Sequence, residues 1–195
     1  KERAGRDRKD EIMQKGVAGR AEERKNPFDI RGQAALIVEA DAGLGPQFAE
    51  ILAREGTELI LVGRNLEKIY SLTNRLEKTY KADVLPIVED VRSERLVERV
   101  LDQVEERFHG FEILINNLTE SSIHDTEDLT DPMTEAGFQM NLMARLRINR
   151  MCVKRFFQPS RYGRIIQVFS GLTTKESMIL PSSPYYISRA AMQAM

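Results

Sequence analysis

A tyrosine and an arginine near the end of the sequence have types and spacing that could carry a proton transfer. Tyr185 and Arg189 lie four residues apart, so on a helix they share one face. A tyrosine hydroxyl ordinarily has a pKa of about 10, which is too high for ready proton exchange at neutral pH. A cation beside such a hydroxyl favours the phenolate form. The pair therefore predicts a proton donor and acceptor, with Tyr185 as the group that carries the proton.

A serine at the end of an apolar segment could complete this chemistry. Ser170 follows the apolar run at residues 164–169 and precedes Gly171. Reduction of a ketone needs a hydride donor and an acid near the carbonyl oxygen, and a serine hydroxyl can donate a hydrogen bond to that oxygen. Each residue also has a structural interpretation, because Tyr185 could pack beside Tyr186 and Ser170 could cap a turn. The catalytic interpretation is the one we adopt.

Two glycines lie at a predicted junction between a strand and a helix. The run Gly43-Leu44-Gly45 follows an apolar segment and precedes a helical pattern that starts at about Pro46. Glycines at such a turn let the backbone approach a pyrophosphate, which the helix N-terminus then stabilises. Glycine is common in any tight turn, but this placement predicts binding of a dinucleotide cofactor.

A single arginine favours one type of dinucleotide. Arg64 lies nineteen residues after Gly45, just beyond the second apolar segment. An acidic residue in this region would bind the 2′-hydroxyl of the adenosine ribose and select NAD. The cation instead favours a 2′-phosphate, and hence NADP with NAD as the weaker choice. The alternative is an ordinary solvated arginine in a loop.

The elements that must position these residues alternate along the chain. Short apolar runs predict buried parallel strands, and the stretches between them have apolar residues at spacings of three and four, which is typical of amphipathic helices. This alternation predicts an α/β fold, a Rossmann-type doubly wound parallel sheet. The predicted strands are Ala34–Val38, 59–62, Val84–Val88, Ile113–Asn116 and 164–169, with helical patterns at 69–80 and 96–108.

From residue 28 to the last residue the sequence resembles the short-chain dehydrogenase/reductase family. Several short motifs occur in the order and approximate spacing of that family. Asp90-Val91 resembles the pair that touches adenine, Asn116-Asn117 the start of the Asn-Asn-Ala-Gly motif, Asn141 the helix asparagine, Ser170 the serine after the fifth strand, and Tyr185 with Arg189 the Tyr-x-x-x-Lys motif.

The resemblance implies an oxidoreductase that transfers a hydride between NADP(H) and a small carbonyl or secondary alcohol. It implies that Asn141 holds a water in the proton path, and it implies a homodimer or homotetramer. The implied catalytic residues are Asn141, Ser170, Tyr185 and Arg189. The implied cofactor-binding residues are Gly43, Leu44, Gly45, Arg64, Asp90, Val91, Asn117, Tyr185 and Arg189.

Three motifs depart from the family pattern. Glu39 replaces the first glycine of the cofactor turn, Leu118-Thr119 replaces Ala-Gly, and Arg189 replaces lysine. An unpaired carboxylate about 5 Å from a phosphate would cost about 3 kcal/mol at an effective dielectric constant of about 20. That cost would weaken binding about a hundredfold, unless Glu39 points away or pairs with a cation. The departures support an alternative, a catalytically impaired relative that acts in regulation or subunit assembly.

The composition limits the other function classes. The formal net charge of −1 favours neither nucleic acid nor an anionic membrane as a partner, and the apolar runs are too short to span a membrane. Cys152 is the only cysteine, and His109 and His124 fit no metal-site pattern, so we expect no metal and a cytoplasmic location. Residues 1–27 form a predicted charged tail. Residues 28–195 form the predicted domain, which lacks the two further strands that family members usually add.

Overall fold

The computed structural model describes residues 28–118, 125–168 and 183–193. Its centre is one sheet in which all neighbouring strands are parallel, in the order β3-β2-β1-β4-β5. This confirms the predicted Rossmann-type α/β fold. The strands are β1 (Ala34–Val38), β2 (Glu58–Gly63), β3 (Val84–Val88), β4 (Ile113–Asn116) and β5 (Arg164–Gln167).

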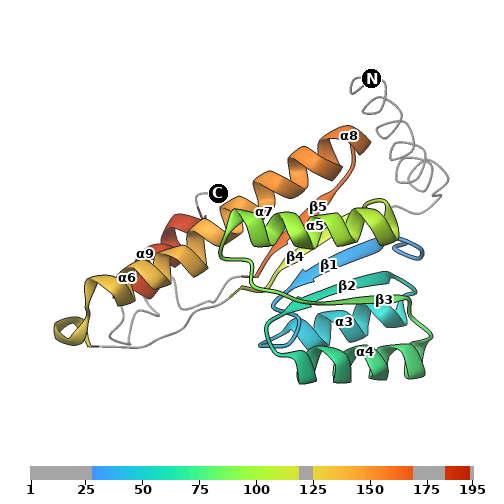
Figure 1. The fold of residues 1–195 in the computed structure, drawn as a ribbon, viewed down its shortest axis with the longest axis horizontal. Coiled ribbons are helices and arrows are strands. Elements are labelled where there is room, and N and C mark those ends of the chain that lie inside the picture. Colours follow the sequence, from blue (N-terminus) through green and yellow to red (C-terminus); the bar gives the residue numbers. More distant parts are fainter. Residues whose placement is uncertain (1–27, 119–124, 169–182, 194–195) are drawn as a thin grey trace.

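The strands are apolar on both faces because helices cover both faces of the sheet. Figure 1 shows α3 (Gly45–Arg54) and α4 (Leu66–Tyr80) on one side and α5 (Glu94–Phe108) and α7 (Ala144–Cys152) on the other. Successive side chains of strand β1 point alternately into the two hydrophobic cores, one on each face of the sheet. Leu36 lies in the core formed with α5 and α7, whereas Ile37 lies in the core formed with α3 and α4.

The boundaries of two covering helices follow from their N-terminal residues. The Asn65 side chain accepts a hydrogen bond from the Lys68 amide at 2.9 Å, and the Ser93 side chain accepts one from the Leu96 amide at 3.3 Å. Ser93 is therefore the N-cap of α5, which begins at Glu94, two residues before the first apolar residue of the helical pattern predicted for 96–108. The remaining helical elements are η2 (Thr126–Asp128), α6 (Asp131–Phe138), η3 (Gln139–Met143), η4 (Val153–Phe157), α8 (Gln158–Ser160) and α9 (Ser183–Gln193).

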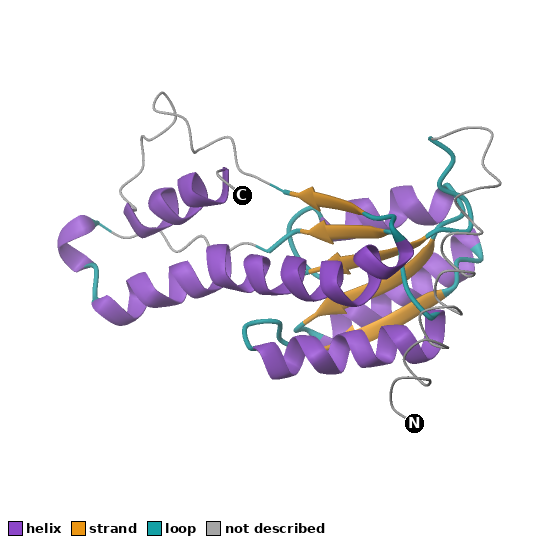
Figure 2. Cartoon of the chain, turned by 90° about the horizontal axis from the view of Figure 1, so that it is seen from above, coloured by secondary structure: helices purple, strands orange, loops and turns teal. Residues whose placement is uncertain are grey.

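One long helical run crosses the sheet and continues beyond it. The elements α6, η3, α7, η4 and α8 follow one another without a break, and η3 and η4 are π-helical turns. Figures 1 and 2 both show α9 beside the end of this run that extends past the sheet. Helix α9 contacts α6 and η3. Since π-turns are frequent at functional sites, the η3–α9 contact is a candidate position for chemistry.

The strand order places a crevice at the carboxyl edge of the sheet. The chain moves outward from β1 to β2 and β3, then returns to the other side of β1 for β4 and β5. Ligands of open α/β sheets bind at such a switch point, outside the carboxyl ends of the central strands. The described part of the chain contains no helix that is long and apolar enough to cross a membrane.

Candidate active site at the carboxyl edge of the sheet

The turn from β1 into α3 is tight at its second glycine. A Cβ atom on Gly45 would lie 2.5 Å from the Glu39 carbonyl oxygen and 2.7 Å from Ala40 Cα. Gly43 has a φ of +53°, in the left-handed region that glycine adopts readily. Helix α3 begins at Gly45, and Leu44 at its N-cap has no side-chain oxygen to bind the first amides. Among the described residues no side chain therefore caps this helix N-terminus, although the Gly45 amide donates to the Ala42 carbonyl oxygen at 2.9 Å and Pro46 has no amide hydrogen. An anion there would interact with the positive end of the helix dipole and the remaining amides.

Replacing Gly45 with alanine should damage this turn. The added methyl group meets backbone atoms, so the turn must widen, at an expected cost of about 1–3 kcal/mol in the free energy of unfolding. Urea denaturation measures this cost, and calorimetry measures the accompanying loss of cofactor affinity. Gly32→Ala is a comparison for backbone strain without a steric clash, because Gly32 has a positive φ of +66°, which Gly45 does not, and open space around its Cβ position. Equal stability of the Gly45→Ala variant and the wild type would show that the turn is not tight.

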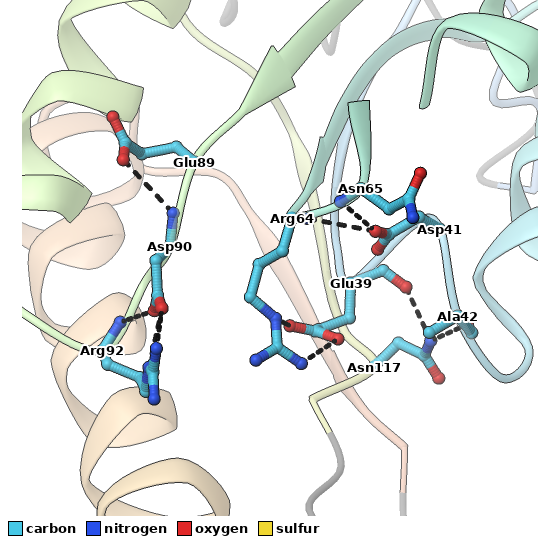
Figure 3. Close-up of polar contacts among 9 residues, drawn as sticks. All are labelled: Glu39, Asp41, Ala42, Arg64, Asn65, Glu89, Asp90, Arg92 and Asn117. Atoms are coloured by element: carbon cyan, nitrogen blue, oxygen red, sulfur yellow. Dashed lines mark hydrogen bonds and ion pairs between the residues drawn. The ribbon is translucent and has the colours of Figure 1, made fainter. Parts of the chain in front are cut away.

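Asn117 holds the turn from the end of β4. Its Nδ2 donates hydrogen bonds to the carbonyl oxygens of Glu39 at 3.0 Å and Ala42 at 2.8 Å (Figure 3). The predicted cofactor residue Asn117 thus lies at the turn. In this structure it shapes the turn through its side chain.

Glu39 has both an unusual backbone and a defined partner. Its φ of +57° lies in the left-handed region, which explains why glycine suits this position. Its carboxylate is buried and pairs with Arg64, with 3.0 Å between Arg64 Nε and Glu39 Oε1. Burial raises the pKa of the Glu39 carboxyl above its usual value, and the opposing effect of Arg64 does not restore it. Of the possibilities that the sequence left open, pairing with a cation is the one observed.

A second acid in the turn, Asp41, fixes the loop after β2. One carboxylate oxygen of Asp41 accepts hydrogen bonds from the backbone amides of Arg64 at 3.0 Å and Asn65 at 2.8 Å (Figure 3). Asp41 was not among the predicted site residues. Its position between the strand and the glycines is the sequence signal that could have found it, because parallel neighbours β1 and β2 end side by side.

Asp90 and Val91 follow β3 at the same edge of the sheet. Asp90 accepts hydrogen bonds from the Arg92 backbone amide at 2.8 Å and from Arg92 Nε at 2.7 Å. Burial alone would raise the pKa of Asp90, but these hydrogen bonds hold it below its usual value. Val91 is buried in the core. The two residues are therefore close to the crevice, with the Asp90 carboxylate held by its own loop.

The predicted catalytic residue Asn141 contacts the helix that carries Tyr185. Asn141 is fully buried on the π-turn η3, and its Nδ2 donates a hydrogen bond to Ser188 Oγ at 3.2 Å. Ser188 Oγ in turn donates to the Tyr185 carbonyl oxygen at 2.9 Å. The structure thus brings Asn141 and α9 together. Ser170 and the side chain of Arg189 lie outside the described residues, so their predicted roles remain predictions.

A buried arginine that the sequence did not single out holds the ends of β4 and β5. The Arg145 side chain is fully buried and donates to the carbonyl oxygens of Asn116, at 3.0 Å, and Leu118. It also donates to Gln167 Oε1 at 3.1 Å. The Leu118 side chain is buried in the core between the sheet and α7, and does not project into the crevice. The larger residue at this family alanine position is therefore accommodated by packing.

Comparison with known proteins places these features in a family. The family model of short chain dehydrogenases matches residues 33–195. The chain is 29% identical over 143 residues to a 3-oxoacyl-acyl-carrier-protein reductase of Rickettsia prowazekii, a match that covers 73% of this chain and 56% of the relative. It is 23% identical over 174 residues to a hydroxysteroid dehydrogenase-like protein 2 of Mus musculus, covering 86% of this chain and 35% of that protein.

Two solved structures show the same fold. An L-sorbose reductase of Gluconobacter frateurii, complexed with NADPH and L-sorbose, superposes with a TM-score of 0.76 at 24% identity, covering 85% of this chain and 62% of that one. An NAD+-bound xylitol dehydrogenase gives 0.77 at 23% identity, with 85% and 62% coverage. The chain therefore spans between 35% and 62% of the length of these relatives. Since the family model covers most of the sequence, the chain belongs to the short chain dehydrogenase family.

Proposed function

We propose that this chain is the cofactor-binding and catalytic portion of an oxidoreductase that transfers a hydride between NADP(H) and a carbonyl or secondary alcohol. The observation that carries the proposal is the tight glycine turn between β1 and α3, at the switch point of the sheet. Asn141 on η3, bound to the helix that carries Tyr185, supports it from the substrate side.

The residues at the crevice fit a dinucleotide in most respects. Gly43, Leu44 and Gly45 with the N-terminus of α3 would hold the pyrophosphate, and the loop after β3 with Asp90 and Val91 would flank the adenine. Arg64 supports NADP(H), since its guanidinium can bind a 2′-phosphate. When bound, the nicotinamide supplies the hydride. Relatives with solved structures include both NADPH-bound and NAD+-bound proteins.

Side chains of this protein would carry out the proton transfer and stabilise the substrate oxygen. In the reduction direction, Tyr185 would donate its hydroxyl proton to the substrate oxygen, and Ser170 would donate a hydrogen bond to the same oxygen. Arg189, one helical turn after the tyrosine, would stabilise the phenolate that forms. Asn141 would position α9 through Ser188, in addition to the water-holding role that the family resemblance implies.

We also propose a small-molecule substrate, a homodimer or homotetramer, and a cytoplasmic location. Apolar side chains on α7 and its neighbours support the assembly, because Met143, Leu146 and Val153 are all exposed on the long helical run. The single cysteine of the sequence supports the location.

A second candidate function is a regulatory or assembly domain without turnover. The specific observation in its favour is the ion pair between Glu39 and Arg64, which lies inside the cofactor turn and occupies the cation expected to bind the cofactor. The substitution of arginine for lysine at position 189 points the same way, because arginine does not readily release a proton.

Transfer of label from cofactor to product separates the two candidates. The full chain is incubated with NADPH deuterated at the transferable C4 position and with 3-oxoacyl thioesters, cyclic ketones and ketoses. The proposed activity predicts deuterium on the carbinol carbon of at least one product. Binding of cofactor without label transfer to any carbonyl would contradict the activity and support the second candidate.

A further inference from the structure

The Glu39–Arg64 ion pair has the geometry with which an arginine binds a phosphate. Arg64 Nε lies 3.0 Å from one oxygen of the Glu39 carboxylate, and an Nη atom donates to the other oxygen at 3.5 Å. Figure 3 shows the guanidinium turned onto the carboxylate with both contacts drawn. Carboxylates and phosphates are bound by the same fork of guanidinium donors. A bound carboxylate and an incoming phosphate therefore compete for the same atoms.

The surrounding contacts determine which part of this pair can move. The backbone amide of Arg64 is held by Asp41, so the start of the side chain is fixed. The Glu39 side chain is only 7% exposed, whereas that of Arg64 is 44% exposed. The guanidinium can consequently turn toward solvent or a ligand, and the carboxylate stays in the turn. A ligand that takes Arg64 must leave the Glu39 charge buried without this partner.

We propose that Glu39 is a specificity-determining residue that competes with the 2′-phosphate of NADP(H) for Arg64 and so narrows the preference for NADP(H) over NAD(H). This inference rests on the cofactor site proposed above. The sequence alone predicted a preference for NADP(H) because Arg64 was treated as a cation that a 2′-phosphate could bind without competition. In the structure Arg64 is paired with Glu39.

The local charge supports a selective effect on the phosphorylated cofactor. The charges that act on Glu39 are the Arg64 cation and the carboxylates of Asp41 and Asp90. A 2′-phosphate would add a charge of about −1.5 to −2 to this region. The neutral 2′-hydroxyl of NAD(H) adds no charge to this region. Removal of the Glu39 charge should therefore help the phosphorylated ligand and leave the other nearly unchanged.

Calorimetry on the full chain tests the competition with ligands that differ only in the 2′-phosphate. The probes are 2′,5′-ADP against 5′-AMP, and NADP+ against NAD+. Glu39→Gln should tighten binding of 2′,5′-ADP and NADP+ by roughly 10- to 100-fold, and should change the other two ligands by less than about threefold. Glu39→Gly should behave in the same way and fold readily, because glycine suits the φ of +57°.

Two further variants show whether the effect passes through Arg64. In an Arg64→Gln background, the Glu39→Gln change should alter 2′,5′-ADP affinity clearly less than it does in the wild type, since no competition for the guanidinium remains and only direct repulsion between Glu39 and the phosphate can act. Glu50→Gln is the matched control. This substitution removes the Glu50 carboxylate on α3, which lies 2.8 Å from Arg75 Nη2 in an ion pair. It should not change the discrimination between phosphorylated and unphosphorylated ligands.

The pH dependence gives an independent measurement. Burial raises the pKa of Glu39, and the groups that face it are Arg64, Asp41 and Asp90. As the pH falls through that raised pKa, Glu39 is protonated and Arg64 is released. The advantage of Glu39→Gln over wild type for 2′,5′-ADP should then shrink toward one. Comparison of the two proteins at each pH cancels the titration of the ligand phosphate, which both share.

Equal tightening of phosphorylated and unphosphorylated ligands would overturn the inference, and so would an effect of the same size in the Arg64→Gln background. The proposed function fails in a different way. The predicted ligand discrimination without hydride transfer to any carbonyl would leave the inference standing and contradict the enzymatic activity. Absence of nucleotide binding in the wild type and all variants would overturn both.

Discussion

Replacing Tyr185 with phenylalanine is expected to lower kcat for carbonyl reduction by about 10²- to 10⁴-fold, the usual contribution of a positioned acid or base. The affinity for reduced cofactor should stay within about threefold, because phenylalanine keeps the ring. Tyr185 lies half-buried on α9, with its ring nearly perpendicular to that of Tyr186 at a centroid distance of 5.7 Å. Loss of turnover would therefore report the hydroxyl group and not the packing of the helix.

Tyr186→Phe is the matched control for this prediction. Tyr186 is its buried neighbour on the same helix, and the substitution removes the same hydroxyl group. Steady-state kinetics with the best substrate, together with calorimetry for the cofactor, should show a large effect only at position 185. Unchanged turnover in Tyr185→Phe would remove this residue from the proton transfer, and equal losses in both variants would assign the effect to packing.

Replacing Arg145 with methionine is expected to lower the free energy of unfolding by about 2–4 kcal/mol. Methionine fills much of the same space but donates no hydrogen bond. The carbonyl oxygens of Asn116 and Leu118 and the amide oxygen of Gln167 would each lose a donor in a buried region. The Asn116 carbonyl oxygen keeps its hydrogen bond from the Val168 amide at 3.1 Å, so the loss falls mainly on Leu118 and Gln167. Each buried acceptor left without a partner costs about 1–3 kcal/mol, and release of the buried guanidinium offsets part of the total.

Urea denaturation of Arg145→Met and Arg147→Met measures this cost. Arg147 lies two residues away on α7, is partly exposed, and donates only to the exposed Arg92 carbonyl among the contacts described. Its loss should change stability by about 0.5 kcal/mol or less. Equal stability of the two variants would show that the ends of β4 and β5 do not depend on the buried arginine.

Much of the fold follows from the sequence for a simple physical reason. A parallel strand covered on both faces must be apolar throughout, so each strand appears as a short continuous apolar run. The predicted bounds of β1, β3 and β4 coincide with the observed ones, and β2 extends one residue further at each end. The glycine turn could also be predicted from the sequence. Gly45 lies too close to backbone atoms to carry a side chain, so the turn requires a glycine that can be recognised in the sequence.

The contacts within the site were harder to predict from the sequence, because they join residues that are far apart along the chain. Glu39 and Arg64 were each noticed, but their pairing depends on the register that sets Val38 beside Val62. Each residue comes shortly after the end of its strand, so the register brings the two side chains within reach of each other. Knowledge of the strand order would have predicted this pair.

No feature of the sequence indicated that Arg145 is buried or that Ser188 is the partner of Asn141. Arg145 occurs among other arginines in a helical segment, and nothing in its neighbours distinguishes a buried arginine from an exposed one. Its burial follows from the path of a helical run that contains the π-turn η3. Ser188 lies 47 residues after Asn141, and only the packing of α9 on η3 brings them together.

Calorimetric titration of the full chain with NADPH and with NADH tests whether this chain binds a dinucleotide, because every proposed step depends on such a cofactor at the β1–α3 turn. We expect saturable binding of at least one of the two cofactors below about 1 mM, the upper end of ordinary affinities for such sites. We also expect weaker binding when Gly45 is replaced by alanine. If neither cofactor binds at millimolar concentration, the proposed function of this chain as a cofactor-binding oxidoreductase is contradicted.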